Sequence, residues 1–267
     1  MPRFLYWTDL HQEHGSFVMP AEEDLPAPID GVLLGGDIDR GLKSLEFAEA
    51  AHRRYNCPVV LVNGNHEFYN HNITKLRGEQ DRRVARLQAR GLDIHLLDGS
   101  SVEIAGARIV GATLWTDFEL DPLHASRARL LAGRSMNDYS RIRTGRGFGR
   151  HLTPEDTLSL HQQDKEALLS MLSSPASGPT VVLTHHMPIR ECLGAFQDHP
   201  LNASFTSDLL GEIRRLHFDV WAFGHSHFGQ PLEIESETGP KRVFTNPRGM
   251  PSEQDRTGFD PLIQIEL

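Results

Sequence analysis

Pro58-Val59-Val60-Leu61-Val62 runs directly into Asn63-Gly64-Asn65-His66-Glu67, so that an apolar stretch ends in polar turn residues. A short apolar stretch without alternation indicates a strand that is buried on both faces. The same pattern of an apolar run followed by a polar cluster occurs at 4–11, 32–37, 180–186 and 220–227. The segments 42–55, 74–90 and 153–172 have helical patterns, and the last opens with the start signal Thr153-Pro154. Alternating strands and helices predict parallel strands with right-handed crossovers and with helices on both faces of the sheet.

Further strands are expected at 94–97, 101–104, 108–114, 241–245 and 262–265. Short glycine-containing turns predict hairpins of 101–104 with 107–114 and of 231–235 with 241–245. These elements indicate an α/β protein with a mixed sheet or two packed sheets flanked by helices. We expect residues 1–267 to form a single domain. Residues 121–152 contain seven arginines and several glycines, which favours a basic, irregular loop over or near the functional site.

The composition of the 267 residues is that of an ordinary globular protein, with 39% hydrophobic and 24% charged residues. The formal net charge of −9 disfavours binding of duplex nucleic acid, which needs a broad basic face. No apolar run approaches the roughly 18 residues of a membrane span, and the first residues lack the pattern of a signal peptide. Two cysteines are too few for a disulfide framework or a thiolate metal site. We therefore expect a cytoplasmic protein that does not bind membranes.

Each polar cluster follows its apolar run, which places it at the carboxyl end of a strand, where open α/β sheets bind ligands. Asp9, Asp37 and Asn65 are spaced by 28 residues, about one strand and its crossover. We expect their side chains to meet at the rim of one sheet. Each of these residues taken alone could also have a purely structural role. Asn65, for example, is suited to cap a helix.

Two strings carry paired donors, Asp9-Leu10-His11 and His225-Ser226-His227. Side chains alternate along an extended chain, so the outer residues of each string are expected on the same side. A nucleophilic Ser226 is rejected, because Phe228 occupies the second glycine position of the G-x-S-x-G pattern. With His185, the donors number seven, too many for one catalytic ion and suited to two. Oxygen and nitrogen donors without sulfur favour divalent ions such as Mn²⁺, Fe²⁺ or Zn²⁺.

Five ordered blocks within residues 9–227 resemble those of the calcineurin-like metallophosphoesterases. The blocks are Asp9-Leu10-His11, Gly36-Asp37-Ile38-Asp39-Arg40, Gly64-Asn65-His66-Glu67, His185-His186 and Gly224-His225-Ser226-His227. The resemblance implies a four-layer α/β/β/α sandwich with two mixed β-sheets flanked by helices. It also implies a dinuclear centre, with Mn²⁺ or Fe favoured and Zn²⁺, Ni²⁺ or Mg²⁺ as alternatives.

Roles follow from the resemblance by position in the motifs. One ion would be held by Asp9, His11 and His227, the other by Asn65, His185 and His225, and Asp37 would bridge them. His185 is preferred to His186 because it comes first after its strand. His66 resembles the catalytic histidine that contacts the phosphoryl group or assists the leaving oxygen. Arg40 stands where protein phosphatases have the aspartate that orients this histidine, so the partner of His66 stays unidentified.

The resemblance implies a phosphoesterase that hydrolyses a small phosphodiester or phosphomonoester, such as a nucleotide, by attack of a metal-bridging hydroxide. Arg40, His186 and Arg248 are candidate substrate contacts. The alternatives are an interaction module that has lost catalysis and a nuclease of the same chemistry. The sequence leaves the oligomeric state open.

Overall fold

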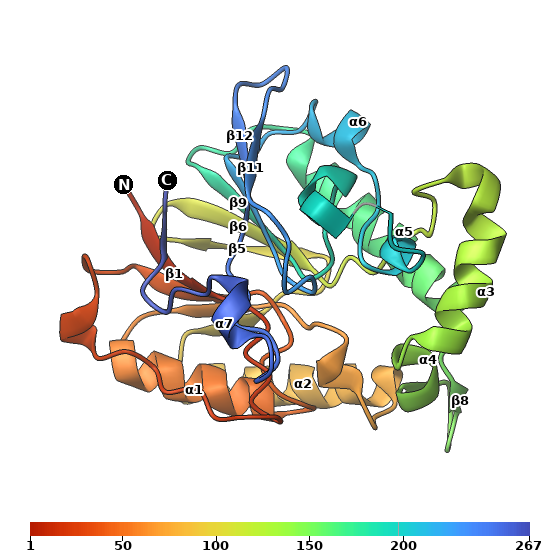
Figure 1. Cartoon of the computed structure of the whole chain (residues 1–267). Helices are drawn as coiled ribbons and strands as arrows, with labels where there is room; N and C mark the ends of the chain where they lie inside the picture. The colour runs from red at the N-terminus through yellow and green to blue at the C-terminus, as the bar shows by residue number, and fades with distance from the viewer. Residues whose placement is uncertain (197) are drawn as a thin grey trace.

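Two β-sheets pack face to face in the computed structural model, which describes residues 1–196 and 198–267 (Figure 1). The strand order of the first sheet is β13 (Gln264–Glu266), β1 (Arg3–Trp7), β2 (Gly31–Leu34), β3 (Val59–Leu61) and β4 (Ile94–Leu96). The second has the order β11 (Leu232–Ile234), β12 (Lys241–Thr245), β10 (Val220–Phe223), β9 (Thr180–Thr184), β6 (Ala107–Ala112) and β5 (Ser100–Ile104). Strands β1 to β4 are parallel, as are β6, β9, β10 and β12. Both predicted hairpins are present, as β5–β6 and β11–β12.

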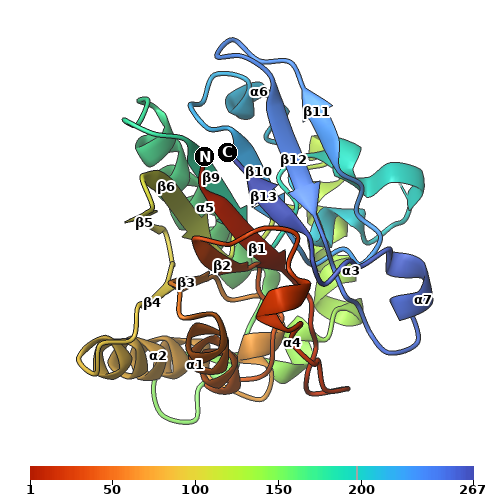
Figure 2. The ribbon, with the colours of Figure 1, turned by 90° about the vertical axis from the view of Figure 1, so that its left-hand side faces the viewer.

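Helices cover one face of each sheet. Helices α1 (Lys43–Tyr55) and α2 (Ile73–Gln88) lie beyond the first sheet, and α5 (Pro154–Leu172) and α6 (Leu210–Ile213) beyond the second (Figure 2). The four-layer α/β/β/α sandwich is therefore confirmed. The expectation of helices on both faces of a sheet is wrong, because β1 to β4 pair in chain order. Right-handed crossovers between strands in that order place every helix on the same side.

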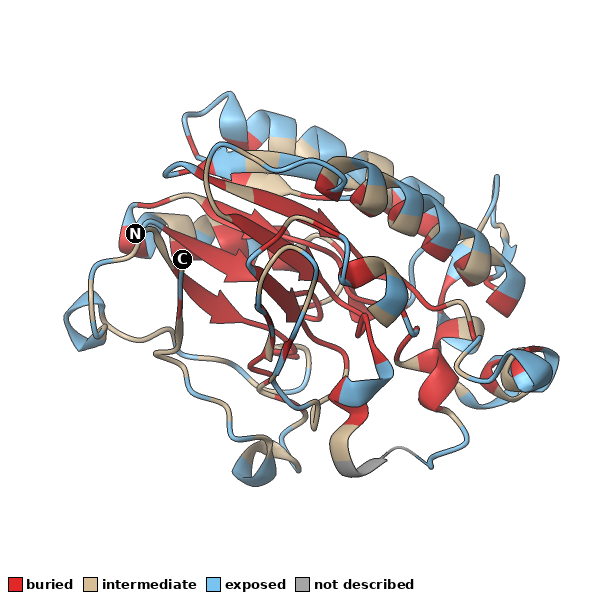
Figure 3. Cartoon of the chain, turned by 90° about the horizontal axis from the view of Figure 1, so that it is seen from above, coloured by how far each residue is buried: buried red, intermediate tan, exposed pale blue. Residues whose placement is uncertain are grey.

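The core between the sheets is made by the apolar runs of the sequence. Phe4, Tyr6 and Leu33 from the first sheet pack against Val181 and Val220 from the second. Strands β1, β2 and β3 are buried along most of their length, as the sequence predicted, and Figure 3 shows the strands as buried and the outer sides of the helices as exposed. Burying one such side chain contributes about 1.5–3 kcal/mol, so this layer stabilises the packing of one sheet on the other.

Residues 121–152 are not irregular. They form a 3₁₀ turn (Pro122–His124), α3 (Ala125–Ser135), α4 (Asp138–Arg141) and the two short strands β7 (Arg143–Thr144) and β8 (Arg150–His151). Arginine is a strong helix former, so the arginines at 127, 129, 134 and 141 are compatible with α3 and α4, and the glycines at 145, 147 and 149 lie in the turn between β7 and β8. The short helices η1 (Glu22–Asp24), η2 (His66–Phe68), η4 (Arg190–Phe196), η5 (Asn202–Ser204) and α7 (Gln254–Thr257) lie in loops. Among the described residues, no helix combines the length and the apolar character needed to cross a membrane.

Candidate metal centre

The predicted donors follow the carboxyl ends of strands in both sheets. Asp9, Asp37 and Asn65 come after β1, β2 and β3 of the first sheet, whereas His185 and His225 come after β9 and β10 of the second. The expectation of a rim formed by one sheet is therefore corrected. The donors meet because the two sheets end side by side.

Hydrogen bonds join the two sheets at this edge. Tyr6 Oη donates to the carbonyl of Phe223 at 2.7 Å, and the backbone N–H of His225 donates to Asp9 Oδ1 at 3.0 Å. Gly224 lies against the side chain of Thr8, and a Cβ there would collide with Thr8 Oγ1. Glycine before His225 is thus required by the close approach of the sheets.

Four of the seven donors adopt left-handed backbone conformations, with φ of 52° at Asp9, 45° at His11, 52° at Asp37 and 66° at His225. Such angles are uncommon outside glycine and concentrate at functional sites. The extended strand ends expected at the two paired strings are therefore wrong. The chain turns sharply at these four donors.

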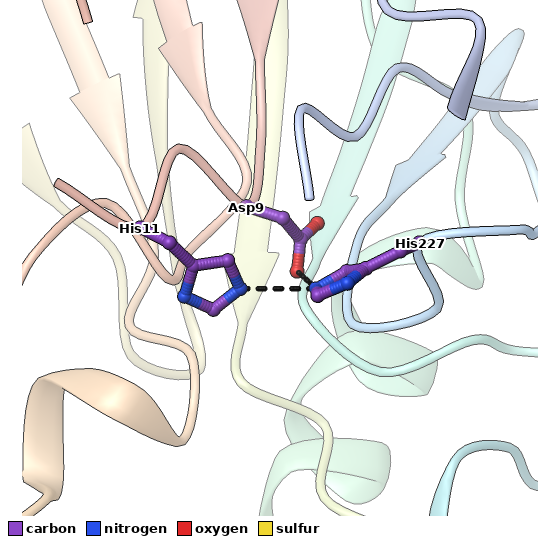
Figure 4. A group of neighbouring side chains, drawn as sticks. All are labelled: Asp9, His11 and His227. Carbon is purple, nitrogen blue, oxygen red and sulfur yellow. Dashed lines mark hydrogen bonds and ion pairs between the residues drawn. The ribbon is translucent and has the colours of Figure 1, made fainter. Parts of the chain in front are cut away.

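The first ligand group consists of Asp9, His11 and His227, whose donor atoms lie within 4.8 Å of one another (Figure 4). His11 Nε2 and His227 Nε2 are 3.0 Å apart, and His227 Nε2 is 3.6 Å from Asp9 Oδ1. Behind the rings, His227 Nδ1 lies 2.6 Å from Glu253 Oε2. Burial opposes the charged form of His227, but Asp9 and Glu253 outweigh it and raise the pKa of His227 to about 9. The Nε2 atoms of His11 and His227 thus face each other, and that of His227 also faces Asp9.

The second ligand group consists of Asp37, His185 and His225, with donor atoms again within 4.8 Å of one another. Asn65 lies beside His185. His185 Nε2 lies 3.5 Å from Asp37 Oδ1 and 3.1 Å from Asn65 Oδ1. His185 Nδ1 lies 2.9 Å from the carbonyl of Gly35, which directs Nε2 into the group. Burial opposes the charged form of His185, but Asp37 raises the pKa of His185 to about 9. Burial also lowers the pKa of His225 well below its ordinary value.

Asp37 lies between the two groups. Its Oδ2 is 3.8 Å from His11 Nε2 in the first group, and its Oδ1 is 3.5 Å from His185 Nε2 in the second. Burial alone would raise the pKa of Asp37, but the charges of His185 and His66 hold it well below its ordinary value. The carboxylate can thus face cations on both sides.

The donors fit a pair of divalent cations. Within residues 1–196 and 198–267, His225 Nε2 is buried without a hydrogen-bond partner, an arrangement that a metal–nitrogen bond would satisfy. Two buried carboxylates and several imidazoles without sulfur match the ligand preferences of first-row divalent ions.

A family model described as calcineurin-like phosphoesterase matches residues 2–229. The chain belongs to the calcineurin-like phosphoesterase family. Because the His and Asp groups are intact, this phosphoesterase is a hydrolase that acts on phosphoric esters. No curated protein matches the chain.

Two solved structures resemble this calcineurin-like phosphoesterase. Phosphopantetheinyl hydrolase (PptH) of Mycobacterium tuberculosis aligns over 99% of this chain and 95% of its own, with a TM-score of 0.68 and 16% identity. A Staphylococcus aureus structure described as a 5′-nucleotidase, in complex with α-ketoglutarate, aligns over 92% of this chain and 49% of its own. Its identity is 14% and its TM-score 0.42. At such identity, the similarity to PptH shows a shared fold.

The predicted catalytic residue of the phosphoesterase, His66, is adjacent to both groups. Its Nε2 lies 3.9 Å from Asp37 Oδ2, and its Nδ1 lies 2.7 Å from Glu13 Oε1. The ring packs on Tyr69 with a centroid distance of 4.2 Å. Burial opposes the charged form of His66, but Asp37 and Glu13 raise its pKa. Glu13 is the partner of His66 that the sequence left unidentified. The only feature of the sequence that could have indicated it is its position two residues after His11.

Glu67 is a second residue whose role the sequence did not reveal. Its carboxylate accepts the backbone N–H groups of Asp37 at 3.0 Å, Ile38 at 2.9 Å and Gly64 at 2.7 Å. Burial raises the pKa of Glu67 to about 8. The last residue of the Gly64–Glu67 motif thus joins the loops after β2 and β3.

The three predicted substrate contacts lie in different surroundings. His186 is 1% exposed and packs on His225 at a centroid distance of 4.2 Å, which places it beneath the second group. Arg248 donates to the backbone carbonyls of Leu10, Gly15 and Ser16, so its guanidinium holds the loop after His11. Arg40 Nε has no hydrogen-bond partner among the described residues. Of the three, Arg40 is therefore the one with a guanidinium N–H that the described residues leave unpaired.

Proposed function

We propose that the phosphoesterase uses two divalent metal ions to hydrolyse a small phosphodiester or phosphomonoester. The observation that carries the proposal is the placement of Asp37 between two buried groups of donors. Asp9, His11 and His227 would hold one ion, and Asn65, His185 and His225 the other. Mn²⁺ or Fe²⁺ suits this mixture of carboxylate, amide and imidazole ligands.

Bound ions would supply an activated water and would polarise the phosphoryl oxygens. The histidines keep Asp9 and Asp37 ionised, since they lower the pKa of both carboxyls against the effect of burial. Burial also excludes competing water and strengthens every charge interaction at the site.

His66 is suited to move a proton at Nε2. Glu13 occupies Nδ1, so that Nε2 is the ring nitrogen that faces the site. During hydrolysis a bond forms between water oxygen and phosphorus, and the bond from phosphorus to the ester oxygen breaks. The proton held at His66 Nε2 would pass to the departing ester oxygen, as general acid catalysis requires.

The experiment uses the 267-residue chain, stripped with a chelator and reloaded with Mn²⁺, Fe²⁺, Zn²⁺, Ni²⁺ or Mg²⁺. Substrates are p-nitrophenyl phosphate, bis(p-nitrophenyl) phosphate and a nucleotide. Because PptH shares the fold, a phosphopantetheinyl ester belongs in the panel. We expect turnover only after reloading and two metal ions per chain by elemental analysis. Absence of turnover with every metal and ester would contradict the proposal and favour a binding module.

A further inference from the structure

The segment 137–143 packs against the loop that carries the predicted ligand Asn65. The backbone N–H of Asn70 donates to the carbonyl of Arg141 at 2.8 Å, and that of Arg143 to the carbonyl of His71 at 2.9 Å. Ile142 is buried in a cluster with Phe68 and Ile73. The segment is therefore fixed to the metal-ligand loop by backbone bonds and by apolar packing.

Asp138 of α4 points from this segment into the site. It is 3% exposed, and its Oδ1 accepts hydrogen bonds from Asn65 Nδ2 and from Tyr69 Oη, each at 2.8 Å. None of the five metallophosphoesterase blocks contains Asp138, which lies 73 residues beyond Asn65. Nothing in the local sequence marks the pair.

The hydrogen bond between Asn65 and Asp138 determines which way the side-chain amide of Asn65 is turned. A carboxylate accepts hydrogen bonds and donates none, so the NH₂ group of Asn65 must face Asp138. The carbonyl oxygen of Asn65 then faces the second group, 3.1 Å from His185 Nε2. An amide turned the other way would present N–H donors to the position of a cation.

We propose that Asp138 is a positioning residue that holds the carbonyl oxygen of Asn65 toward the second metal ion. Binding of that ion then depends on the docking of the 121–152 segment. This inference rests on the proposed function, because it takes Asn65 as a ligand. It goes beyond that function by coupling one of the two ions to a part of the chain outside the motifs.

The primary test measures Mn²⁺ binding by calorimetry and by elemental analysis, without an activity readout. Asp138→Ala removes the acceptor, and we expect about 10- to 100-fold weaker binding of one Mn²⁺ and unchanged binding of the other. Asp138→Asn keeps a carbonyl oxygen and should bind both ions nearly as the wild type does. Tyr139→Phe, next to Asp138 on α4, removes a hydroxyl that lies 3.1 Å from Thr157 Oγ1 and serves as the matched control, because both ions should bind to it as to the wild type.

A second variant keeps the test valid if Asp138→Ala fails to fold. Asn65→Asp places two carboxylates against each other and should weaken the second ion. The exchange Asn65→Asp with Asp138→Asn restores one donor and one acceptor, and should recover the second Mn²⁺ to within about tenfold of the wild type.

Two results would overturn the inference alone: Asp138→Ala binding both ions like the wild type, or the exchange binding no better than Asn65→Asp. A wild type that never binds a second ion would overturn the proposed function as well. The two failures are therefore distinguishable.

Discussion

The two ligand groups differ in the partners that contact the Nδ1 atoms of their histidines, on the side away from the site. In the first group Glu253 lies behind His227, and Glu13 lies 3.4 Å from His11 Nδ1. In the second group a neutral backbone carbonyl lies behind His185, and the carboxylates that raise its pKa, Asp37 and Asp9, belong to the site itself. His227 keeps 14% side-chain exposure, whereas His185 has none.

If the two groups hold cations as proposed, they would do so in two ways. The outer carboxylates would make the imidazoles of the first group stronger ligands and would fix their orientation. The second group depends on burial, on Asp37 and on the amide of Asn65. Substitution of a residue that contacts the Nδ1 atom of one ligand histidine, such as Glu253, should therefore weaken the binding of one ion. Substitution of Asp37, which lies between the groups, should weaken the binding of both.

The largest effect is expected for Asp37→Ala, because it removes the residue between the groups. Binding of both ions should weaken, and kcat/KM should fall by at least about 10⁴-fold, the scale seen when a catalytic unit is dismantled. Elemental analysis and steady-state kinetics test this. Asp39→Ala, in the same loop, is the control and should keep both ions. If Asp37→Ala retains two ions per chain, Asp37 does not join the groups.

His66→Ala separates catalysis from metal binding. We expect kcat to fall by about 10²- to 10⁴-fold, since a proton donor is lost. Both ions should remain, because His66 belongs to neither set of proposed ligands. The loss should be greater for an alkyl ester than for a nitrophenyl ester, whose leaving group needs no proton. His71→Ala is the control, and an equal loss for both esters would rule out proton donation.

Glu253→Gln tests the first group alone. Its carboxylate accepts from His227 and from the backbone N–H of Met250 at 2.9 Å, so the exchange removes charge and keeps the size. One ion should bind about 10- to 100-fold more weakly and the other unchanged. The exposed Asp255→Asn on the same helix should change neither. Equal weakening of both ions would show that the groups are not independent.

The sequence predicted those strands and donor residues that can be recognised from a local pattern. Apolar runs identified β1, β2, β3, β9 and β10, and the polar residues after them are the ones that the fold brings together. The prediction of helix start at Thr153 also held, since Thr153 and Asp156 cap α5 reciprocally.

The residues behind the ligands could not be predicted, because loop paths and not periodicity bring them there. Asp138 reaches Asn65 from a segment that looked irregular, and Glu13 reaches His66 only because the chain turns at His11 with φ of 45°. The convergence of two sheets was missed for a similar reason. The equal spacing of Asp9, Asp37 and Asn65 reflects successive strands of the first sheet. It does not indicate that the strands of the second sheet end at the same place.

A buried carboxylate outside the site should have the smallest effect on metal binding and activity, and it isolates what the histidines do for the pKa of Asp37. Asp164 Oδ2 accepts from the backbone N–H of Leu114 at 2.9 Å. Burial, followed by the charge of Asp98, raises the pKa of Asp164 to about 7, and the cation of Arg77 opposes this only in part.

Between pH 4 and pH 7 the folded state therefore holds a proton on Asp164 that the unfolded chain releases, so the free energy of unfolding should fall as pH rises. In Asp164→Asn, which keeps the acceptor oxygen, this contribution disappears. Relative to the wild type, the free energy of unfolding of the variant should rise by about 3–4 kcal/mol between these pH values, measured by urea unfolding of chelator-treated protein. A difference that stays constant with pH would show that the pKa of Asp164 is not raised in the folded state. The contrast with Asp37, which is equally buried but faces histidines, would then need another cause.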